Sequence, residues 1–172
     1  SHYTTLTIDL YDKLRKEYSN VGVVIQAYLR RTEGDIKRLT DGGPTNVRLC
    51  KGIYIESEEI AFKGRDEIRD NFAKCLDLLF SRGAYVGIAT HDEVIIESAK
   101  SIIKKHSLDR TKYEFQMLLG VRETMRRALI KEGHRLRVYV PFGADWYGYS
   151  VRRLKENPSV AGHVVKAMFT RG

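Results

Sequence analysis

The sequence has few cysteines and no long apolar run, and both absences narrow what the protein can be. Cys50 and Cys75 are the only cysteines among 172 residues, too few and too far apart for a disulfide framework or a zinc site. No stretch of about 18 apolar residues occurs, which excludes a membrane-spanning helix. Residues 1–5 lack the basic flank and apolar core of a secretory signal. We therefore expect a chain that folds in a reducing compartment.

The common nucleotide, metal and RNA-binding signatures are also absent. The chain contains neither a glycine-rich dinucleotide fingerprint nor a P-loop. His91 has no second histidine or carboxylate at metal-ligand spacing, so no metal site is predicted. Aromatic–basic RNA-binding patterns are missing, and nucleic acid is not an expected partner.

The charge balance is basic, with a formal net charge of +8. Such a charge favours a polyanion or an anionic membrane surface as partner. However, bases alternate with acids along the expected helices, as where Arg65 and Arg69 stand among Asp66, Glu67 and Asp70. This pattern is typical of a solvated surface. A basic, non-enzymatic binding module stays an alternative hypothesis.

Apolar runs and amphipathic stretches alternate along the chain and predict an α/β fold. After a helix near residues 3–18, strands are expected near residues 21–29, 46–50, 84–89, 113–120 and 137–143. Helices are expected near residues 32–39, 66–81, 92–105, 122–131 and 145–157, with Thr32 and Asp92 as caps. The order favours a parallel sheet with helical crossovers. The near-continuous apolar run 21–29 is typical of a strand buried on both faces.

Polar residues stand near the end of each expected strand, and the stretch 46–54 is central among them. There an apolar alternation ends in Lys51, Gly52 and Tyr54, a pattern that is also common in ordinary turns. The carboxyl ends of parallel strands share one edge, where ligands bind. We therefore expect one ligand site built from Gln26, Arg48, Lys51, Thr90, His91, Gln116 and Tyr139.

The last expected helix carries four polar residues on one face. Tyr149, Arg152, Arg153 and Glu156 are spaced at i, i+3, i+4 and i+7. One interpretation is a surface helix with Arg152 paired to Glu156. The other is a pair of guanidinium groups that binds a carboxylate or phosphate. Both interpretations stay open on this spacing.

Six blocks in this order resemble the flavin-dependent proline dehydrogenases, most closely the bacterial monofunctional kind. The blocks are residues 26–28, 48–54, 89–92, 114–118, 137–141 and 149–157. The likeness extends over residues 1–157, and residues 158–172 are expected to form a C-terminal tail helix.

The resemblance implies a fold and an activity. The fold is a (β/α)8 TIM-type barrel, of which this chain covers about the last five strand–helix units. The activity is oxidation of L-proline to Δ1-pyrroline-5-carboxylate by hydride transfer to FAD, with electrons passed to a quinone. The location that we expect from it is the cytoplasm, where peripheral contact with the inner face of the bacterial membrane would suit an enzyme that reduces quinones.

The resemblance also implies roles for individual residues. Arg48 is the expected catalytic donor near flavin N5, and the flavin-binding set is Gln26, Arg48, Lys51, Gly52, Ile53, Thr90, His91 and Gln116. Arg152 and Arg153 are expected to bind the carboxylate of the substrate, among Leu118, Tyr139, Tyr149 and Tyr54. The family usually has Ala where Ile53 stands, so we expect a narrower site.

The chain is shorter than a complete barrel, which needs about 250 residues. We expect it to be the C-terminal part of a longer enzyme. Because an open barrel exposes sheet edges, pairing with a second copy into a homo-oligomer is expected. A rival enzyme class is a barrel aldolase or lyase with Lys51 as Schiff-base amine.

Overall fold

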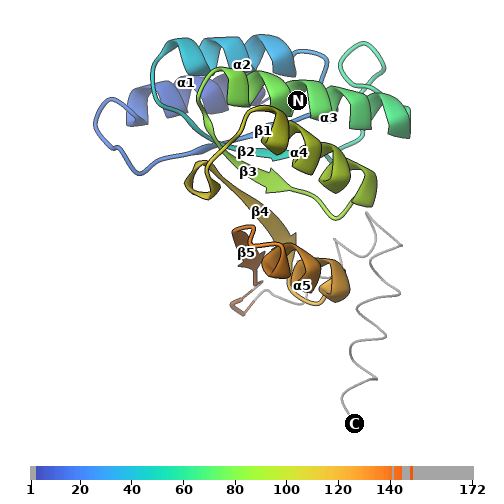
Figure 1. The fold of residues 1–172 in the computed structure, drawn as a ribbon. Helices are drawn as coiled ribbons and strands as arrows, with labels where there is room; N and C mark the ends of the chain where they lie inside the picture. Colours follow the sequence, from blue (N-terminus) through green and yellow to red (C-terminus); the bar gives the residue numbers. More distant parts are fainter. Residues whose placement is uncertain (1–2, 141, 145–147, 149–172) are drawn as a thin grey trace. The chain divides into compact units, whose positions relative to one another are not determined.

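The computed structural model describes residues 3–140, 142–144 and 148 in two compact units, Ser1–Glu114 and Phe115–Gly172. The first contains α1 (Thr4–Leu14), β1 (Val23–Gln26), α2 (Thr32–Asp41), β2 (Asn46–Cys50), α3 (Arg65–Ser81), β3 (Tyr85–Ala89), α4 (Glu93–Lys105) and the 3-10 helix η1 (Arg110–Lys112). The unit boundary falls within β4 (Tyr113–Leu118), which is followed by α5 (Glu123–Lys131) and β5 (Leu136–Tyr139) (Figure 1). The predicted alternation of strands and helices is thus confirmed. The expected helices 145–157 and 158–172 lie outside the described residues, apart from residue 148.

The strands of the first unit pair in parallel, as predicted. Val24 of β1 lies level with Arg48 of β2, which lies level with Gly87 of β3. Two residues further along, Cys50 lies between Gln26 and Ala89. The carboxyl ends of all three strands therefore meet at one edge.

The helices bury one face of this sheet and leave part of the other open. Val47 and Leu49 are fully buried, as is Phe72 of α3, which packs on the same side. On the other face Arg48 is exposed, and Val24 keeps 50% of its surface. Successive side chains of a strand point to opposite faces. The expectation that the run 21–29 is buried on both faces is therefore wrong at Val24, because the described helices cover only the face opposite to it.

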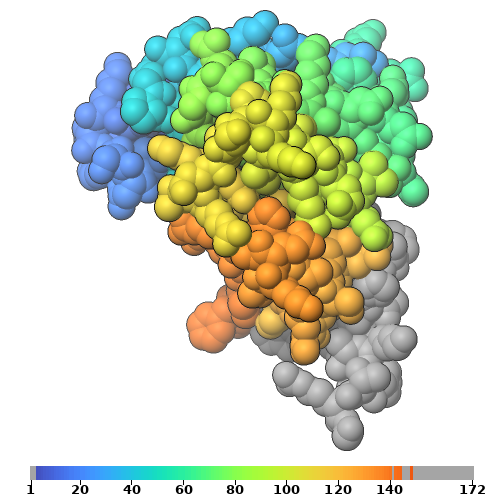
Figure 2. All heavy atoms as spheres, viewed as in Figure 1, coloured from blue at the N-terminus to red at the C-terminus, as the bar shows by residue number. Residues whose placement is uncertain are grey.

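Helix α3 is anchored as its apolar spacing predicts. Phe72, Cys75, Leu76 and Leu79 are fully buried, so Cys75 packs in the core. Helix α4 lies beside α3, and the two are seen together in green to yellow on the surface of the first unit in Figure 2. Burial of one large apolar side chain stabilises a fold by about 1.5–3 kcal/mol, so this row is a main source of the stability of the unit.

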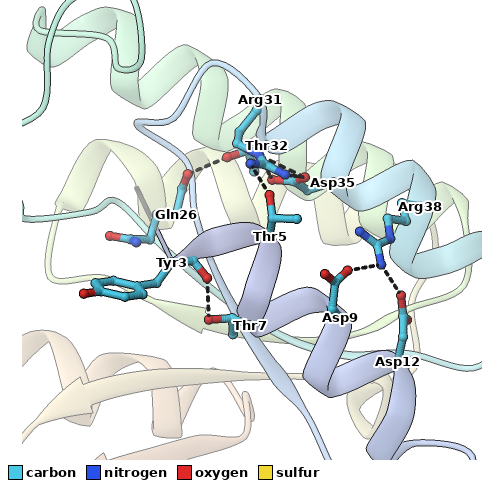
Figure 3. A network of polar contacts seen from close by, with 10 residues as sticks. All are labelled: Tyr3, Thr5, Thr7, Asp9, Asp12, Gln26, Arg31, Thr32, Asp35 and Arg38. Carbon is cyan, nitrogen blue, oxygen red and sulfur yellow. Dashed lines mark hydrogen bonds and ion pairs between the residues drawn. The ribbon is translucent and has the colours of Figure 1, made fainter.

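Helix α1 is held partly by charge. Its leucines Leu6 and Leu10 are 63% and 57% exposed. Its polar side faces α2, where Arg38 Nη2 lies 2.6 Å from Asp9 Oδ1 and 2.8 Å from Asp12 Oδ2 (Figure 3). One guanidinium thus binds two successive turns of α1 and fixes the helix against α2.

The two expected helix caps differ in outcome. Asp92 caps α4, where its side chain accepts a hydrogen bond from the backbone N–H of Val94. Thr32 is not a cap: Arg31 holds that position, and Thr32 is the first residue of α2. Its hydroxyl donates to the carbonyl of Gln26 at 2.6 Å (Figure 3), so it binds the end of β1 instead of a helical N–H.

An ion pair connects α2 to α3. Glu33 of α2 lies 3.0 Å from Lys37 in the same helix and 2.6 Å from Lys74 of α3. Hydrogen bonds from Lys74 and then Lys37 lower the pKa of Glu33 from its usual 4.5 to about 2. A carboxyl whose pKa is depressed on folding stabilises the fold above its ordinary pKa, and this contribution is lost as pH falls through the folded value.

We expect Glu33→Gln to reduce the acid sensitivity of the fold. The wild type should lose stability between pH 4.5 and about 2 as Glu33 takes up a proton, and the variant lacks that titration. The measurement is the urea midpoint of unfolding at both ends of this window. Glu59→Gln, in the exposed loop between β2 and α3, is the control that should behave like the wild type. Equal acid sensitivity of the wild type and Glu33→Gln would contradict the role of this ion pair.

Candidate functional site

The edge formed by the ends of β1, β2 and β3 brings together five of the predicted site residues. Gln26 is the last residue of β1, and Lys51 directly follows β2. Thr90 and His91 directly follow β3; Thr90 is buried and His91 is half-buried. Arg48 lies on the open face, two residues before the end of β2. The strand ends share one edge as predicted, and the roles of these residues stay predictions.

Arg48 lies in a polar, open place on the sheet. Its neighbour on β3 is Gly87, which has no side chain to compete for the space above it. Next to it, the Cys50 thiol donates to the carbonyl of Ile25 at 3.5 Å. Burial raises the pKa of Cys50, and the Arg48 guanidinium acts in the opposite direction. Arg48 is therefore an exposed cation with five N–H donors.

Lys51 and Asp92 join the ends of β2 and β3. Lys51 Nζ lies 3.2 Å from Asp92 Oδ2, and the side chain of Lys51 is 41% exposed. Arg69 of α3 binds the same carboxylate, with Nε 3.1 Å from Oδ2 and Nη2 3.1 Å from Oδ1. The Asp92 side chain itself is only 8% exposed.

The environment of Asp92 favours the ionised carboxylate. Burial raises its pKa, but hydrogen bonds from Arg69 and Lys51 outweigh this, and the pKa of Asp92 lies below its usual range. Burying a charged carboxylate is costly unless cationic partners donate hydrogen bonds to it, and Arg69 and Lys51 do so here. The sequence interpretation of Arg69 as part of a solvated surface is therefore wrong: the side chain is half-buried and bound to Asp92.

Gly52 packs against the ring of Tyr28 with backbone geometry that suits glycine. Its φ is +105°, and a Cβ at this position would collide with the Tyr28 ring. Tyr28 is 5% exposed, and burial, followed by nearby Glu56, raises its pKa to about 12. Its hydroxyl has no hydrogen-bond partner among the residues that the structure describes. The backbone that follows Lys51 is thus held against an aromatic wall.

The loop after Gly52 carries the predicted residues Ile53 and Tyr54. Both are exposed, by 47% and 60%. The base of the loop returns to β1, where the backbone N–H of Phe62 donates to the carbonyl of Tyr28 at 2.8 Å and Leu29 pairs with Ala61. Ile53 and Tyr54 are therefore at an open tip over a fixed base.

The second unit carries three more predicted residues. Strands β4 and β5 are parallel, with Gln116 level with Arg137 and Leu118 level with Tyr139. The N–H of Leu119 donates to the carbonyl of Tyr139 at 3.0 Å. Gln116, Leu118 and Tyr139 therefore share one face of this strand pair, as the alternation of side chains requires.

Three predicted substrate residues, Tyr149, Arg152 and Arg153, lie outside the described residues, as does Glu156. Their roles stay predictions. Within the described ranges, no group of three or more histidine, cysteine, aspartate or glutamate side chains could hold a metal ion. In the same ranges no helix is long and apolar enough to span a bilayer.

Sequence reasoning missed three residues that shape the edge: Asp92 as an ion-pair acceptor, Arg69 as its partner, and Tyr28 as the wall behind Gly52. It had assigned Asp92 only a capping role. The available signal was the place of Asp92 three residues after the end of β3, at the edge where the carboxyl ends of parallel strands meet. Nothing in the local sequence identified Arg69, because its partner stands 23 positions away.

Comparison with known proteins decides the family. The family model described as Proline dehydrogenase matches residues 1–166. The chain belongs to the proline dehydrogenase family. Proline dehydrogenase 2 of Bacillus subtilis (strain 168) is 44% identical over 94% of this chain and 53% of its own length. The proline dehydrogenase of Deinococcus radiodurans is 38% identical over 95% of this chain and 53% of its own. The chain spans about half the length of these curated relatives.

The solved structures agree with the family. A crystal structure of proline utilization A (PutA) from Bdellovibrio bacteriovorus, inactivated by N-propargylglycine, matches with a TM-score of 0.82 and 30% identity. The match covers 90% of this chain and 19% of the PutA chain. A PutA structure with proline bound in remote sites has a TM-score of 0.79 and 25% identity over 98% and 20% of the two chains. The predicted α/β class, as part of a (β/α)8 barrel, and the predicted family are both confirmed.

We expect Gly52→Ala to destabilise the protein more than Gly43→Ala. The φ angle is +105° at Gly52 and +104° at Gly43, so both substitutions incur backbone strain of about 1–2 kcal/mol. Only at position 52 does the added methyl also collide with Tyr28, whereas nothing lies within 4 Å at position 43. The measurement is the urea midpoint of each variant. Equal losses would show that the Tyr28 contact has no energetic weight.

Proposed function

We propose that the intact protein, meaning the natural gene product that contains this sequence, oxidises L-proline to Δ1-pyrroline-5-carboxylate with FAD as cofactor and a quinone as electron acceptor. The main support is the family match over residues 1–166, together with the gathering of Gln26, Arg48, Lys51, Thr90 and His91 at one edge of the first unit.

The residues at this edge fit a flavin dinucleotide. Arg48 is exposed on the open face, and the side chain of Lys51, three positions later, is 41% exposed. The amide of Gln26 and the hydroxyl of Thr90 add neutral hydrogen-bonding groups at the neighbouring strand ends. Such a set suits a ligand that combines an anionic diphosphate with a ring rich in carbonyl and nitrogen acceptors. Gln26, Arg48, Lys51, Gly52, Ile53, Thr90, His91 and Gln116 are the residues that would hold it.

The bound flavin would supply the acceptor for the hydride that proline loses when its C–N bond becomes C=N. The task of the protein is then to bind and orient. Arg48 would supply positive charge to stabilise the negative charge that develops on the reduced ring. Arg152 and Arg153 are proposed to bind the carboxylate of proline. Leu118, Tyr139, Tyr149 and Tyr54 are proposed as the walls that keep the ring in place and exclude water.

The Schiff-base alternative receives less support from the first unit. A lysine nucleophile must be an unprotonated amine, which a desolvated site or a neighbouring cation favours. Lys51 is instead 41% exposed and lies 3.2 Å from a carboxylate, that of Asp92. Borohydride trapping with a carbonyl substrate would be the signature of that alternative chemistry.

The basic-module alternative is also less favoured. Several cations of the first unit are already paired with acids, among them Lys37 with Glu33, Arg38 with Asp9, and Lys105 with Asp77. Paired charges give a solvated surface and not a continuous basic patch. Steeply salt-dependent retention on DNA or anionic vesicles would support the module instead.

The decisive test uses the intact protein. It should be yellow when purified, proline should bleach the flavin absorbance, and proline should drive reduction of a quinone-like dye. Arg48→Met should lower kcat/KM by roughly 100-fold or more, because one positioned donor to a developing charge is lost. Its unfolding midpoint should stay near that of the wild type, because Arg48 is exposed.

Arg127→Met is the matched control, since Arg127 is an exposed arginine of α5 that pairs with Glu123 within its own helix. It should retain full activity. Absence of flavin and of proline-dependent dye reduction in the wild type would reject the proposed function. Full activity of Arg48→Met would reject only the role of that residue.

A further inference from the structure

The carboxylate of Asp92 has no free acceptor position. Its Oδ2 accepts from Lys51 Nζ at 3.2 Å and from Arg69 Nε at 3.1 Å. Its Oδ1 accepts from Arg69 Nη2 at 3.1 Å and from the backbone N–H of Val94 at 3.2 Å. A carboxylate offers about four acceptor sites, and all of them are used. The group cannot rotate without losing one of these contacts, so its position is fixed by α3 and by the first turn of α4.

Lys51, in contrast to Asp92, still has hydrogen-bonding capacity to offer a ligand. Its ammonium carries three donors on a flexible stem, and a free lysine loses much rotamer freedom when a ligand orders it. One donor is given to Asp92, and the 41% exposure of the side chain leaves the others accessible at the edge of the sheet. Because the Asp92 carboxylate is already fixed, it orders the Lys51 side chain before a ligand arrives. This lowers the entropic cost of binding the ligand.

We propose that Asp92 is the positioning residue for Lys51: with Arg69 and α4 holding its carboxylate, it fixes the place from which the ammonium donates to the bound flavin. This inference rests on the proposed function. Asp92 acts through Lys51 and does not itself contact the flavin, since its acceptor positions are filled. Removal of its charge should therefore matter only as long as Lys51 is present.

The test is a double-mutant cycle on the intact protein with FAD as the probe. Asp92→Asn removes the charge but keeps a residue that caps helices well. Its dissociation constant for FAD, from the change in flavin fluorescence, should rise roughly tenfold, as for the loss of one charge-assisted contact. Lys51→Ala should weaken binding at least as much. The double variant should bind no more weakly than Lys51→Ala alone, because the two residues act as one unit.

Asp66→Asn is the matched control. Asp66 pairs with the same Arg69 at 2.9 Å, but its side chain is 87% exposed, and the ion pair of Lys51 is with Asp92 instead. It should bind FAD like the wild type. Urea midpoints of all variants separate stability from binding, and Asp92→Ser, a second uncharged cap, replaces Asp92→Asn if that variant does not fold.

Two results would overturn the inference while the proposed function stands: FAD affinity of Asp92→Asn equal to that of Asp66→Asn, or effects of Asp92→Asn and Lys51→Ala that simply multiply. A wild type that binds no flavin would overturn both the inference and the proposed function. Unequal affinities of the two aspartate variants, with a double variant equal to Lys51→Ala, would support the inference.

Discussion

The parallel register of β1, β2 and β3 is the constraint on which the site of the first unit depends. It places Val24, Arg48 and Gly87 level with one another across the sheet. Two residues further along the strands, and on the same face, it places Gln26, Cys50 and Ala89 level with one another. Because side chains alternate between faces, a shift by one residue would turn Arg48 into the core and bring Leu49 to the open face. The buried row on the helical side, including Val47 and Leu49, makes such a shift costly. Apolar packing on one face thus decides which polar groups stand on the other.

The charges at the edge follow from the same arrangement. Lys51 and Asp92 are distant in sequence, but Lys51 directly follows β2, Asp92 is the third residue after β3, and the two strands are neighbours. Helix α3, which crosses from β2 to β3, supplies Arg69 to the same carboxylate. The crossover helix therefore does more than cover the sheet, since it also sets the charge of the edge.

The sequence was a good guide to elements and to the core, because apolar spacing is local information. It located the helix that buries Phe72, Leu76 and Leu79, and it placed Gln26, Lys51 and Thr90 at strand ends. The sequence was a poor guide to which polar side chains bind each other in the fold. The partners of Arg69 and Thr32 lie on other elements, and only the fold decides whether a basic residue meets water or a buried carboxylate. The exposure of Val24 was missed for a related reason, since composition does not tell which face of a strand the helices cover.

The loop between β2 and α3 combines an anchored base with an open tip. At its base, Phe62 and Ala61 pair with the backbone of Tyr28 and Leu29, just after β1. At its other end, Gly52 packs against the ring of Tyr28. At the tip, Ile55 is 98% exposed and Tyr54 is 60% exposed. Changes of length or composition at the tip therefore leave the strand register untouched. The loop is therefore a segment whose tip natural selection can vary while the scaffold beneath it stays the same.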